Sequence, residues 1–379
     1  MQTPDRMSVP QGAFQLNLYP QRKRETLRAW DAADEYALHH VHGENSLKDG
    51  DGLLILNDGF GALSVALADY GPQMMSDSFI SHRGVAANLA PNGKKSTSVR
   101  LLNSLQCPDG PCDIALVKIP KHLSLLEDQL YRMRRSLHPD AHIIGAGMAR
   151  HIHKSTLELF ERIIGPIHTS LARKKARLIF CQPNPAIDPG DSPYPTYYTL
   201  ENTAYRLANQ AGLFSREKLD NGTRLLLEHI PQSDRKQSII DLGCGNGVIG
   251  MVAAERNPAA EVTFVDESFL AVASAEENFR AVFSDGRSAA FRATDCLNGI
   301  PGGSADLILT NPPFHRDRAV GDAVAWQMFS ESRSALKPGG TLMVVGNWHL
   351  GYHTKLKHLF GNCHTLSTDT KFVVLESVR

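Results

Sequence analysis

The chain has 379 residues, 42% of them hydrophobic, which exceeds what one ordinary core supports, so we expect two domains of about 150–200 residues each. The formal net charge is zero, which argues against a protein that coats nucleic acid without specificity. Because no run of about 18 apolar residues occurs and residues 1–14 lack an apolar signal core, we expect a cytoplasmic protein without membrane contact. The six cysteines are scattered and none forms a CxxC pair, so we predict neither disulfides nor a metal site.

Two parts of the chain repeat one pattern over some 130 residues. The stretch DGLLILNDGFGALSVALADYG, from residue 50, and the stretch KQSIIDLGCGNGVIGMVAAERNP, from residue 236, each read as an apolar strand, a glycine-rich turn and a helix of small residues. Further on, the segments around Asp77 and Asp266 match, and we align these two acids. The repeat predicts two α/β domains of one topology, with strands and helices alternating around a mostly parallel sheet.

A proline-rich segment separates the two copies. Residues 182–195, QPNPAIDPGDSPYP, carry five prolines and favour an extended linker. We therefore place the boundary near residue 190, which predicts domains at 1–190 and 191–379.

The two copies differ where chemistry would lie. The first has Ile55 where the second has Asp241, and the bulky Phe60 stands inside its glycine turn. It also has Lys118 where the second copy has Asn311. We therefore interpret the second copy as catalytic and the first as a degenerate domain.

The loop DLGCGNG, residues 241–247, follows a strand and opens a helix, but it lacks the G-x-G-x-x-G spacing of dinucleotide-binding proteins. An acid before the glycines repels a pyrophosphate and suits a ligand with a cation, such as an amino acid's amino group. Asp266, at the end of the next strand, would bind a ribose diol, and Asp295 would bind an adenine amine. Together these elements predict S-adenosylmethionine as the cofactor.

The stretch ILTNPPFH, residues 308–315, ends a buried strand on an amide followed by two prolines and an aromatic ring. The Asn311 side-chain oxygen and the Pro312 carbonyl can accept the two hydrogens of an exocyclic amine, which aims its lone pair at a methyl donor. Phe314 can stack on a base. This pattern alone leaves adenine N6, guanine N2 and a glutamine amide open as substrates.

Residues 213–379 resemble the class I methyltransferases, and NPPF resembles the motif of those that act on planar nitrogens. Residues 213–230 resemble the segment that covers the methionine end of the cofactor in small-domain RNA methyltransferases, which implies that Phe214, Gly222 and Thr223 line the pocket. The resemblance implies cofactor contacts from the following residues: Asp241, Gly243, Gly245, Asn246, Gly247, Asp266, Glu267, Asp295, Cys296 and Asn311. It implies two tandem class I methyltransferase-like, Rossmann-like domains that arose by internal duplication.

Over nearly the whole chain, the sequence resembles the RlmG family of large-subunit ribosomal RNA guanine-N2 methyltransferases, a sibling of the RsmC family. Segments that carry the resemblance include AWDAADEY (29–36), KIPK (118–121), DLGCGNGVIG (241–250) and NPPFH (311–315). The resemblance implies a monomer that methylates one guanine of 23S ribosomal RNA, with the degenerate domain holding the RNA. The basic side chains expected to contact phosphates are Arg132, Arg134, Arg135, Arg173, Lys174, Lys175 and Arg177.

Three alternatives remain open at this point. The first is a small-subunit rRNA guanine-N2 methyltransferase, which has the same plan. The second is a protein glutamine N5-methyltransferase, in which NPP is usually followed by tyrosine rather than by the Phe314 seen here. The third is a non-catalytic RNA-binding assembly factor.

Overall fold

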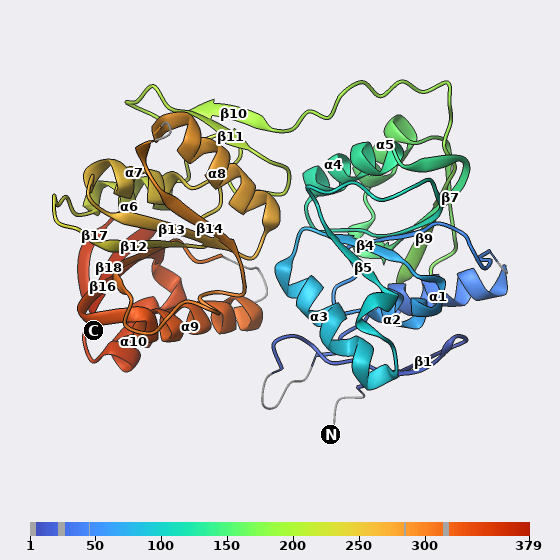
Figure 1. Ribbon diagram of the computed structural model, residues 1–379, viewed down its shortest axis with the longest axis horizontal. Helices are drawn as coiled ribbons and strands as arrows, with labels where there is room; N and C mark the ends of the chain where they lie inside the picture. The colour runs from blue at the N-terminus through green and yellow to red at the C-terminus, as the bar shows by residue number, and fades with distance from the viewer. Residues whose placement is uncertain (1–4, 22–26, 45, 284–285, 314–317) are drawn as a thin grey trace. The chain divides into compact units, whose positions relative to one another are not determined.

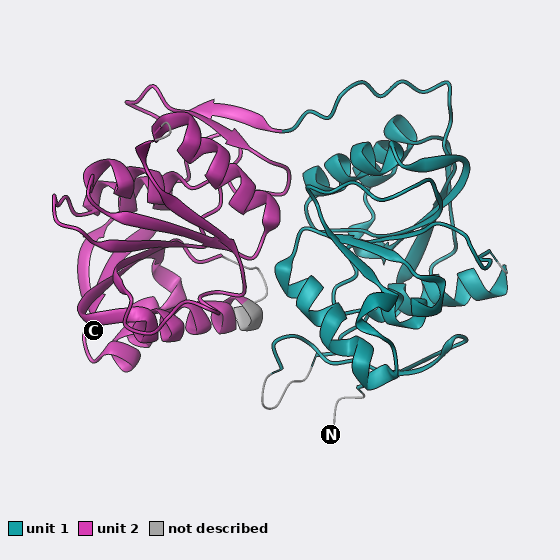
Figure 2. Ribbon diagram, viewed as in Figure 1, with its two compact units in different colours: residues 1–194 teal, residues 195–379 magenta. Residues whose placement is uncertain are grey.

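The computed structural model describes residues 5–21, 27–44, 46–283, 286–313 and 318–379. The chain divides into two compact units, Met1–Tyr194 and Pro195–Arg379, which are coloured separately in Figure 2. The division lies four residues beyond the boundary expected near residue 190.

The first unit contains a seven-stranded sheet of order β5-β4-β3-β6-β7-β9-β8. Its first five strands are parallel, and β9 and β8 complete it as an antiparallel edge. The strands are β3 (Leu53–Leu56), β4 (Gln73–Ser76), β5 (Arg100–Asn103), β6 (Cys112–Lys118), β7 (Leu137–Met148), β8 (Ile167–Thr169) and β9 (Ala176–Cys181). The helices are α1 (Ala32–Gly43), α2 (Ala62–Ala66), α3 (Phe79–Leu89), α4 (Leu123–Arg134) and α5 (Lys154–Ile163).

The second unit repeats this topology with the order β14-β13-β12-β15-β16-β18-β17. Its strands are β12 (Ser238–Leu242), β13 (Glu261–Asp266), β14 (Ala289–Ala293), β15 (Ala305–Thr310), β16 (Leu336–Asn347), β17 (His364–Thr368) and β18 (Phe372–Val378). Its helices are α6 (Asn221–His229), α7 (Val248–Arg256), α8 (Phe269–Phe283), α9 (Arg318–Ala335) and α10 (Tyr352–Phe360). Since the two strand orders correspond one to one, the predicted tandem of Rossmann-like domains is confirmed.

Helices cover both faces of each sheet, as Figure 1 shows. In the second unit, α6, α7 and α8 lie over one face and α9 and α10 over the other. The central strands are therefore buried on both sides, which explains why ADLILT in β15 is a nearly continuous apolar run rather than an alternating one.

A β-hairpin precedes each sheet, and the sequence analysis missed both hairpins. They are β1 (Arg6–Val9) with β2 (Gly12–Gln15), and β10 (Thr196–Thr199) with β11 (Arg206–Asn209). In the second unit, Asn278 donates to the carbonyls of Ala208 and Asn246 and accepts from the Ala208 N–H, so it ties the hairpin to the glycine loop. Asn88 makes the same contacts with Asn17 and Phe60 in the first unit. This paired clamp is a structural signature of the duplication.

The predicted linker runs outside the sheets but is held against the first unit. Arg134 donates to the carbonyls of Asn184 and Ile187, and the Tyr131 hydroxyl donates to the carbonyl of Pro189. The proline-rich segment is thus an ordered strap over most of its length.

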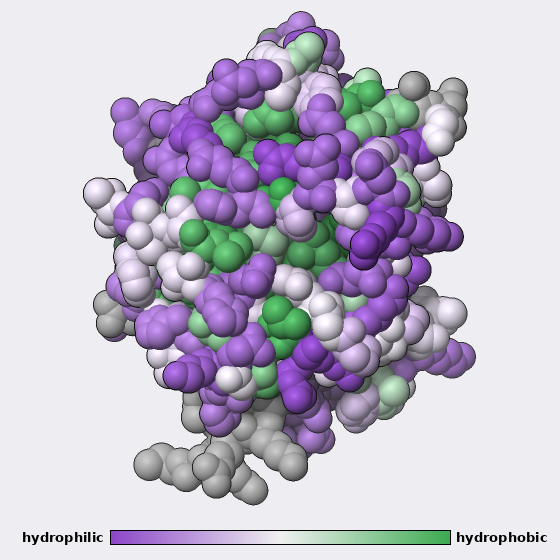
Figure 3. Space-filling model, turned by 90° about the vertical axis from the view of Figure 1, so that its left-hand side faces the viewer, coloured by the Kyte–Doolittle hydropathy of each residue, from purple (hydrophilic) through white to green (hydrophobic). Residues whose placement is uncertain are grey.

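No helix in the described part of the chain is long and apolar enough to cross a membrane. Figure 3 shows one face of the molecule, where hydrophilic residues predominate and apolar ones lie in scattered areas. Such a mixture is ordinary for a face in contact with water.

Candidate active site

The glycine loop lies between β12 and α7 in a backbone conformation that only glycine adopts easily. Gly243, Gly245 and Gly247 have φ angles of 74°, 54° and 82°. A Cβ on Gly247 would lie 2.8 Å from the Cβ of Ala275 in α8, so this position is also closed to side chains by packing. The Gly243 and Cys244 N–H groups donate to the Val265 carbonyl, which fixes the loop to β13.

Asp241 is fully buried at the end of β12 and only half satisfied. Its Oδ2 accepts the Gly250 N–H at 2.8 Å, whereas its Oδ1 is buried without a hydrogen-bond partner among the described residues. Burial raises the pKa of the Asp241 carboxyl to about 7, and the neighbouring Asp266 adds to the shift. A cationic group at Oδ1 would satisfy this atom and stabilise the carboxylate.

Asp266 ends β13, and its carboxylate is held by backbone donors from Gly245, Ser268 and Glu267. Its Oδ2 accepts the Gly245 N–H and its Oδ1 accepts the Ser268 N–H, each at 3.0 Å. Burial raises the pKa of this carboxyl. A carboxylate has about four lone-pair sites, so the rigidly oriented side chain keeps acceptor capacity for a diol. Glu267 beside it is exposed.

Asp295 is buried in a polar network with α9 that the sequence analysis did not foresee. Its Oδ1 accepts from Gln327 Nε2 at 3.0 Å, and the same nitrogen donates to Glu331. The other oxygen of Glu331 accepts the Leu297 N–H at 2.7 Å. Cys296, between the two anchored residues, has a φ of 45°. Gln327 and Glu331 are four residues apart on one helix, and this spacing is the sequence feature that could have indicated the network.

The Asn246 side chain is engaged away from the loop. Its Nδ2 donates to Tyr198 Oη and Asn209 Oδ1 of the hairpin, and its Oδ1 accepts the Val248 N–H. A cofactor contact from Asn246 would therefore have to come from its backbone, because its side chain holds the loop to the hairpin.

Asn311 follows β15 and is oriented by α6. Its Nδ2 donates to Thr223 Oγ1 at 2.9 Å and to Asp220 Oδ2 at 3.2 Å. Because a carboxylate only accepts, the amide must turn its NH₂ toward Asp220 and its oxygen away. Asn311 Oδ1 is buried and finds no hydrogen-bond partner within the part of the chain that the structure describes. The site therefore presents a fixed, unused acceptor.

The remaining expected residues fall into three groups. Thr223 is buried and contacts Asn311, and Pro312 is buried. Phe214 is 64% exposed, so by itself it closes no pocket. Phe314 lies outside the described residues. Across the described ranges, no three His, Cys, Asp or Glu side chains are grouped so as to hold a metal ion.

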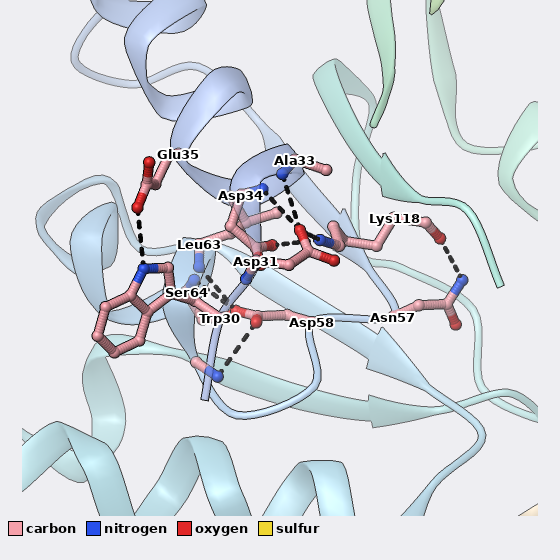
Figure 4. Close-up of polar contacts among 11 residues, drawn as sticks. Trp30, Asp31, Ala33, Asp34, Glu35, Asn57, Asp58, Leu63, Ser64 and Lys118 are labelled. Carbon is pink, nitrogen blue, oxygen red and sulfur yellow. Dashed lines mark hydrogen bonds and ion pairs between the residues drawn. The ribbon is translucent and has the colours of Figure 1, made fainter. Parts of the chain in front are cut away.

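In the corresponding region of the first unit, polar side chains pair with one another, as Figure 4 shows. Lys118, at the position of Asn311, forms ion pairs with Asp31 at 2.8 Å and Asp34 at 2.7 Å. Burial opposes the charge on Lys118, but the two carboxylates prevail and raise its pKa. Asn57, at the position of Gly243, keeps a φ of 61° and forms two hydrogen bonds with Gln129.

One sequence alignment needs correction. The Ser78 N–H donates to Ser76 Oγ, just as the Ser268 N–H donates to Asp266 Oδ1, and each pair ends a strand and opens a helix. Asp266 therefore corresponds to Ser76 rather than to Asp77. The first unit lacks the second acid as well as the first.

The basic residues differ in availability. Arg173, Lys174 and Lys175 are exposed in a tight turn before β9, although Lys174 pairs with Glu35. Arg132 is paired with Asp128, and the exposed Arg135 lies 3.8 Å from Asp191. Arg177 is half-buried.

Arg134 is the exception to the expected phosphate contacts. Both of its terminal nitrogens donate to backbone carbonyls, those of Ile163, Ile164, Asn184 and Ile187. The expectation for Arg134 is wrong, because its guanidinium fastens the linker strap.

The chain resembles known proteins over nearly its whole length. Residues 4–185 match the RLMG N-terminal domain and residues 204–376 match the methyltransferase small domain. The chain is 47% identical to the ribosomal RNA large subunit methyltransferase G of Streptomyces avermitilis, over 99% of both chains. It is 46% identical to the protein of the same name from Pseudomonas aeruginosa PAO1, over 98% of both.

Among solved structures, the fold matches the T. thermophilus 16S rRNA N2 G1207 methyltransferase, RsmC, in complex with AdoMet and guanosine. The TM-score is 0.75, with 21% identity, over 99% of this chain and 97% of that chain. At this identity the match establishes the tandem fold.

Proposed function

Because this chain belongs to the ribosomal RNA large subunit methyltransferase G family, we propose that it transfers a methyl group from S-adenosylmethionine to the N2 amine of one guanine in 23S ribosomal RNA. The observation that carries the proposal is the buried, unpartnered Oδ1 of Asn311. A buried acceptor without a partner costs about 1–3 kcal/mol, which is offset when a substrate donor reaches it.

Asn311 positions the nucleophile. The N2 lone pair of guanine is delocalised into the ring, so the amine must become more tetrahedral before it can attack. An acceptor that takes one N–H, with the Pro312 carbonyl taking the other, turns the lone pair out of the ring plane. Asp220 and Thr223 hold the Asn311 amide in place, so little reorganisation accompanies the reaction.

The residues of the glycine loop and the next two strand ends fit S-adenosylmethionine, which supplies an electrophilic methyl group on a sulfonium. Asp241 Oδ1 receives the amino group, and the backbone of Gly243, Gly245, Asn246 and Gly247 lines the methionine part. Asp266, with Glu267 beside it, holds the ribose diol, and Asp295 with Cys296 holds the adenine. The unsatisfied Oδ1 of Asp241 supports this fit, because burial there disfavours a carboxylate without a cation.

The first unit holds the RNA. Its exposed turn at Arg173, Lys174 and Lys175 suits phosphate contacts, with Arg132, Arg135 and Arg177 as further candidates. Phe314 stacks on the target base once it has left its helix. The protein acts as a monomer in the cytoplasm.

The test is methyl transfer from labelled cofactor to protein-free 23S rRNA purified from a strain that lacks the gene. We expect one methyl group per molecule, released as N2-methylguanosine on digestion, and a single mapped position. Parallel reactions with 16S rRNA and with a release-factor peptide should stay unlabelled. Label in the peptide, in 16S rRNA or in N6-methyladenosine would overturn the proposal.

A further inference from the structure

A second amide with a buried oxygen lies near Asn311, at the carboxyl end of the neighbouring strand. Asn347 is the last residue of β16, the parallel neighbour of β15. Its Oδ1 is buried and has no hydrogen-bond partner among the residues described. Neither the glycine loop nor the expected cofactor contacts involve this side chain.

Two independent patterns place Asn347 on the face of the sheet that carries Asn311. Along β16, Met343 and Val345 belong to the core under α6 and α7, whereas Leu342 and Val344 belong to the opposite core. Since strand side chains alternate, Asn347 continues the first set.

The cross-strand partner gives the same result. Asn347 lies opposite Phe372 of β18, and directly opposed residues of antiparallel strands share a face. Phe372 packs in the core under α6, where a Cβ on Gly222 would lie 2.9 Å from its ring. Asn311 reaches the same helix through Thr223.

The register brings the two amides close together. Thr310 pairs with Val344, so Asn311 is level with Val345 and Asn347 lies two residues further along the neighbouring strand. With strands about 4.8 Å apart and a rise of about 3.3 Å per residue, the two Cα atoms are roughly 8 Å apart. Two asparagine side chains can bring their oxygens to adjacent atoms of one base from that separation.

We propose that Asn347 Oδ1 accepts the N1–H of the target guanine beside the N2 amine held by Asn311, and so selects guanine over other purines. The inference rests on the proposed function. Guanine presents two adjacent donors on this edge, N1–H and the N2 amine, whereas adenine presents an unprotonated N1 beside its N6 amine. Two fixed acceptors therefore fit guanine and leave repelling lone pairs against adenine.

The experiment compares RNA substrates that carry guanine or 2-aminopurine at the mapped position. Both bases have the N2 amine, but N1 of 2-aminopurine is an acceptor. We expect the wild-type protein to prefer guanine, and Asn347→Leu, which removes the acceptor at nearly constant size, to reduce that preference by about 5- to 100-fold. Asn347→Asp keeps an acceptor and should keep most of the preference.

A matched control is Asn257→Ala. Asn257 is buried and also has an Oδ1 without a partner among the described residues. It follows the C-terminal end of α7, on the side of the sheet where the amino ends of the parallel strands lie, away from Asn311 and Asn347. Its replacement should leave the preference unchanged. Melting temperature and affinity for S-adenosylhomocysteine report whether each variant is folded, and Asn347→Ala replaces Asn347→Leu if the larger residue disturbs packing.

The outcomes separate the inference from the proposed function. If the wild-type protein methylates guanine and folded Asn347→Leu or Asn347→Ala keeps the full preference, Asn347 is not the selecting residue. If the wild-type protein transfers no methyl group to guanine in 23S rRNA, the proposed function itself fails.

Discussion

Replacing Asn311 with alanine should slow methyl transfer while leaving the fold and the cofactor affinity nearly intact. The substitution removes two donated hydrogen bonds, to Thr223 and Asp220, but Asp220 still accepts the Thr223 N–H at 2.9 Å and so remains satisfied. The loss of about 1 kcal/mol per hydrogen bond is offset in part because the unpartnered Oδ1 is removed as well. We therefore expect a change in unfolding free energy of about 1 kcal/mol.

The effect on the rate should be much larger. A preorganised group that acts mainly in the transition state supplies roughly 2–4 kcal/mol, which corresponds to about 30- to 1000-fold in rate. The assay is single-turnover methylation of 23S rRNA at saturating cofactor, because this separates transfer from binding. If Asn311→Ala transfers the methyl group at the wild-type rate, the reasoning is refuted and Asn311 only stabilises its loop.

Asn311→Asp offers a sharper form of the same test. An aspartate would place a carboxylate oxygen against Asp220 Oδ2, where Nδ2 now lies 3.2 Å away, so it should be as damaging as alanine despite keeping an acceptor. Adding Asp220→Asn restores a donor opposite the new carboxylate, and we expect the double variant to recover part of the lost rate. A double variant slower than both single ones would contradict the assigned orientation of the amide.

Three further predictions concern the cofactor site and the first unit. Asp266→Ala should weaken S-adenosylhomocysteine binding tenfold or more by calorimetry, since it removes charge-assisted hydrogen bonds worth about 1.5–3 kcal/mol each; unchanged affinity would contradict the ribose assignment. Because the pKa of Asp241 is raised to about 7, cofactor binding below that pH must release a proton from this carboxyl. Cofactor affinity should therefore rise as the pH increases from 5.5 to 7, and this pH dependence should be weaker in Asp241→Asn. Lys118→Ala should lower the unfolding free energy of the first unit by about 3–5 kcal/mol in denaturant unfolding, because it leaves the buried Asp34 carboxylate without a cationic partner. Lys118→Met combined with Asp34→Asn should be nearly neutral, because it removes both charges.

The conformation of the glycine loop could be predicted from the sequence, because the loop is local in the chain. Asp241 and the three glycines lie within one strand-turn-helix unit, and each glycine has the positive φ that its residue type suggests. The repeat likewise predicted one topology for both units, because the central strands carry apolar runs in both copies.

Contacts between distant segments could not be read from the sequence. Asn311 is oriented by Asp220 and Thr223, about 90 positions earlier, and nothing in NPPF indicates which helix will meet it. Arg134 resembled a phosphate ligand because its neighbours are basic, but its four carbonyl partners come from two later segments. Asp77 was aligned with Asp266 because acids were matched by type, whereas the backbone register depends on where each helix begins.

The divergence of the two copies follows from how each satisfies its buried polar groups. In the second unit, one oxygen each of Asp241, Asn311 and Asn347 is buried without a partner among the described residues, an arrangement that costs stability unless a ligand supplies donors. In the first unit, the apolar Ile55 stands at the position of Asp241, and Lys118, at the position of Asn311, forms ion pairs with Asp31 and Asp34. Asn57, at the position of Gly243, forms hydrogen bonds with Gln129. Asp58 likewise accepts the N–H groups of Gly61, Leu63 and Ser64 at the start of α2. Because these polar groups of the first unit already have hydrogen-bond or ion-pair partners, a ligand would not stabilise them further. The first copy could therefore keep the fold and lose the cofactor without losing stability.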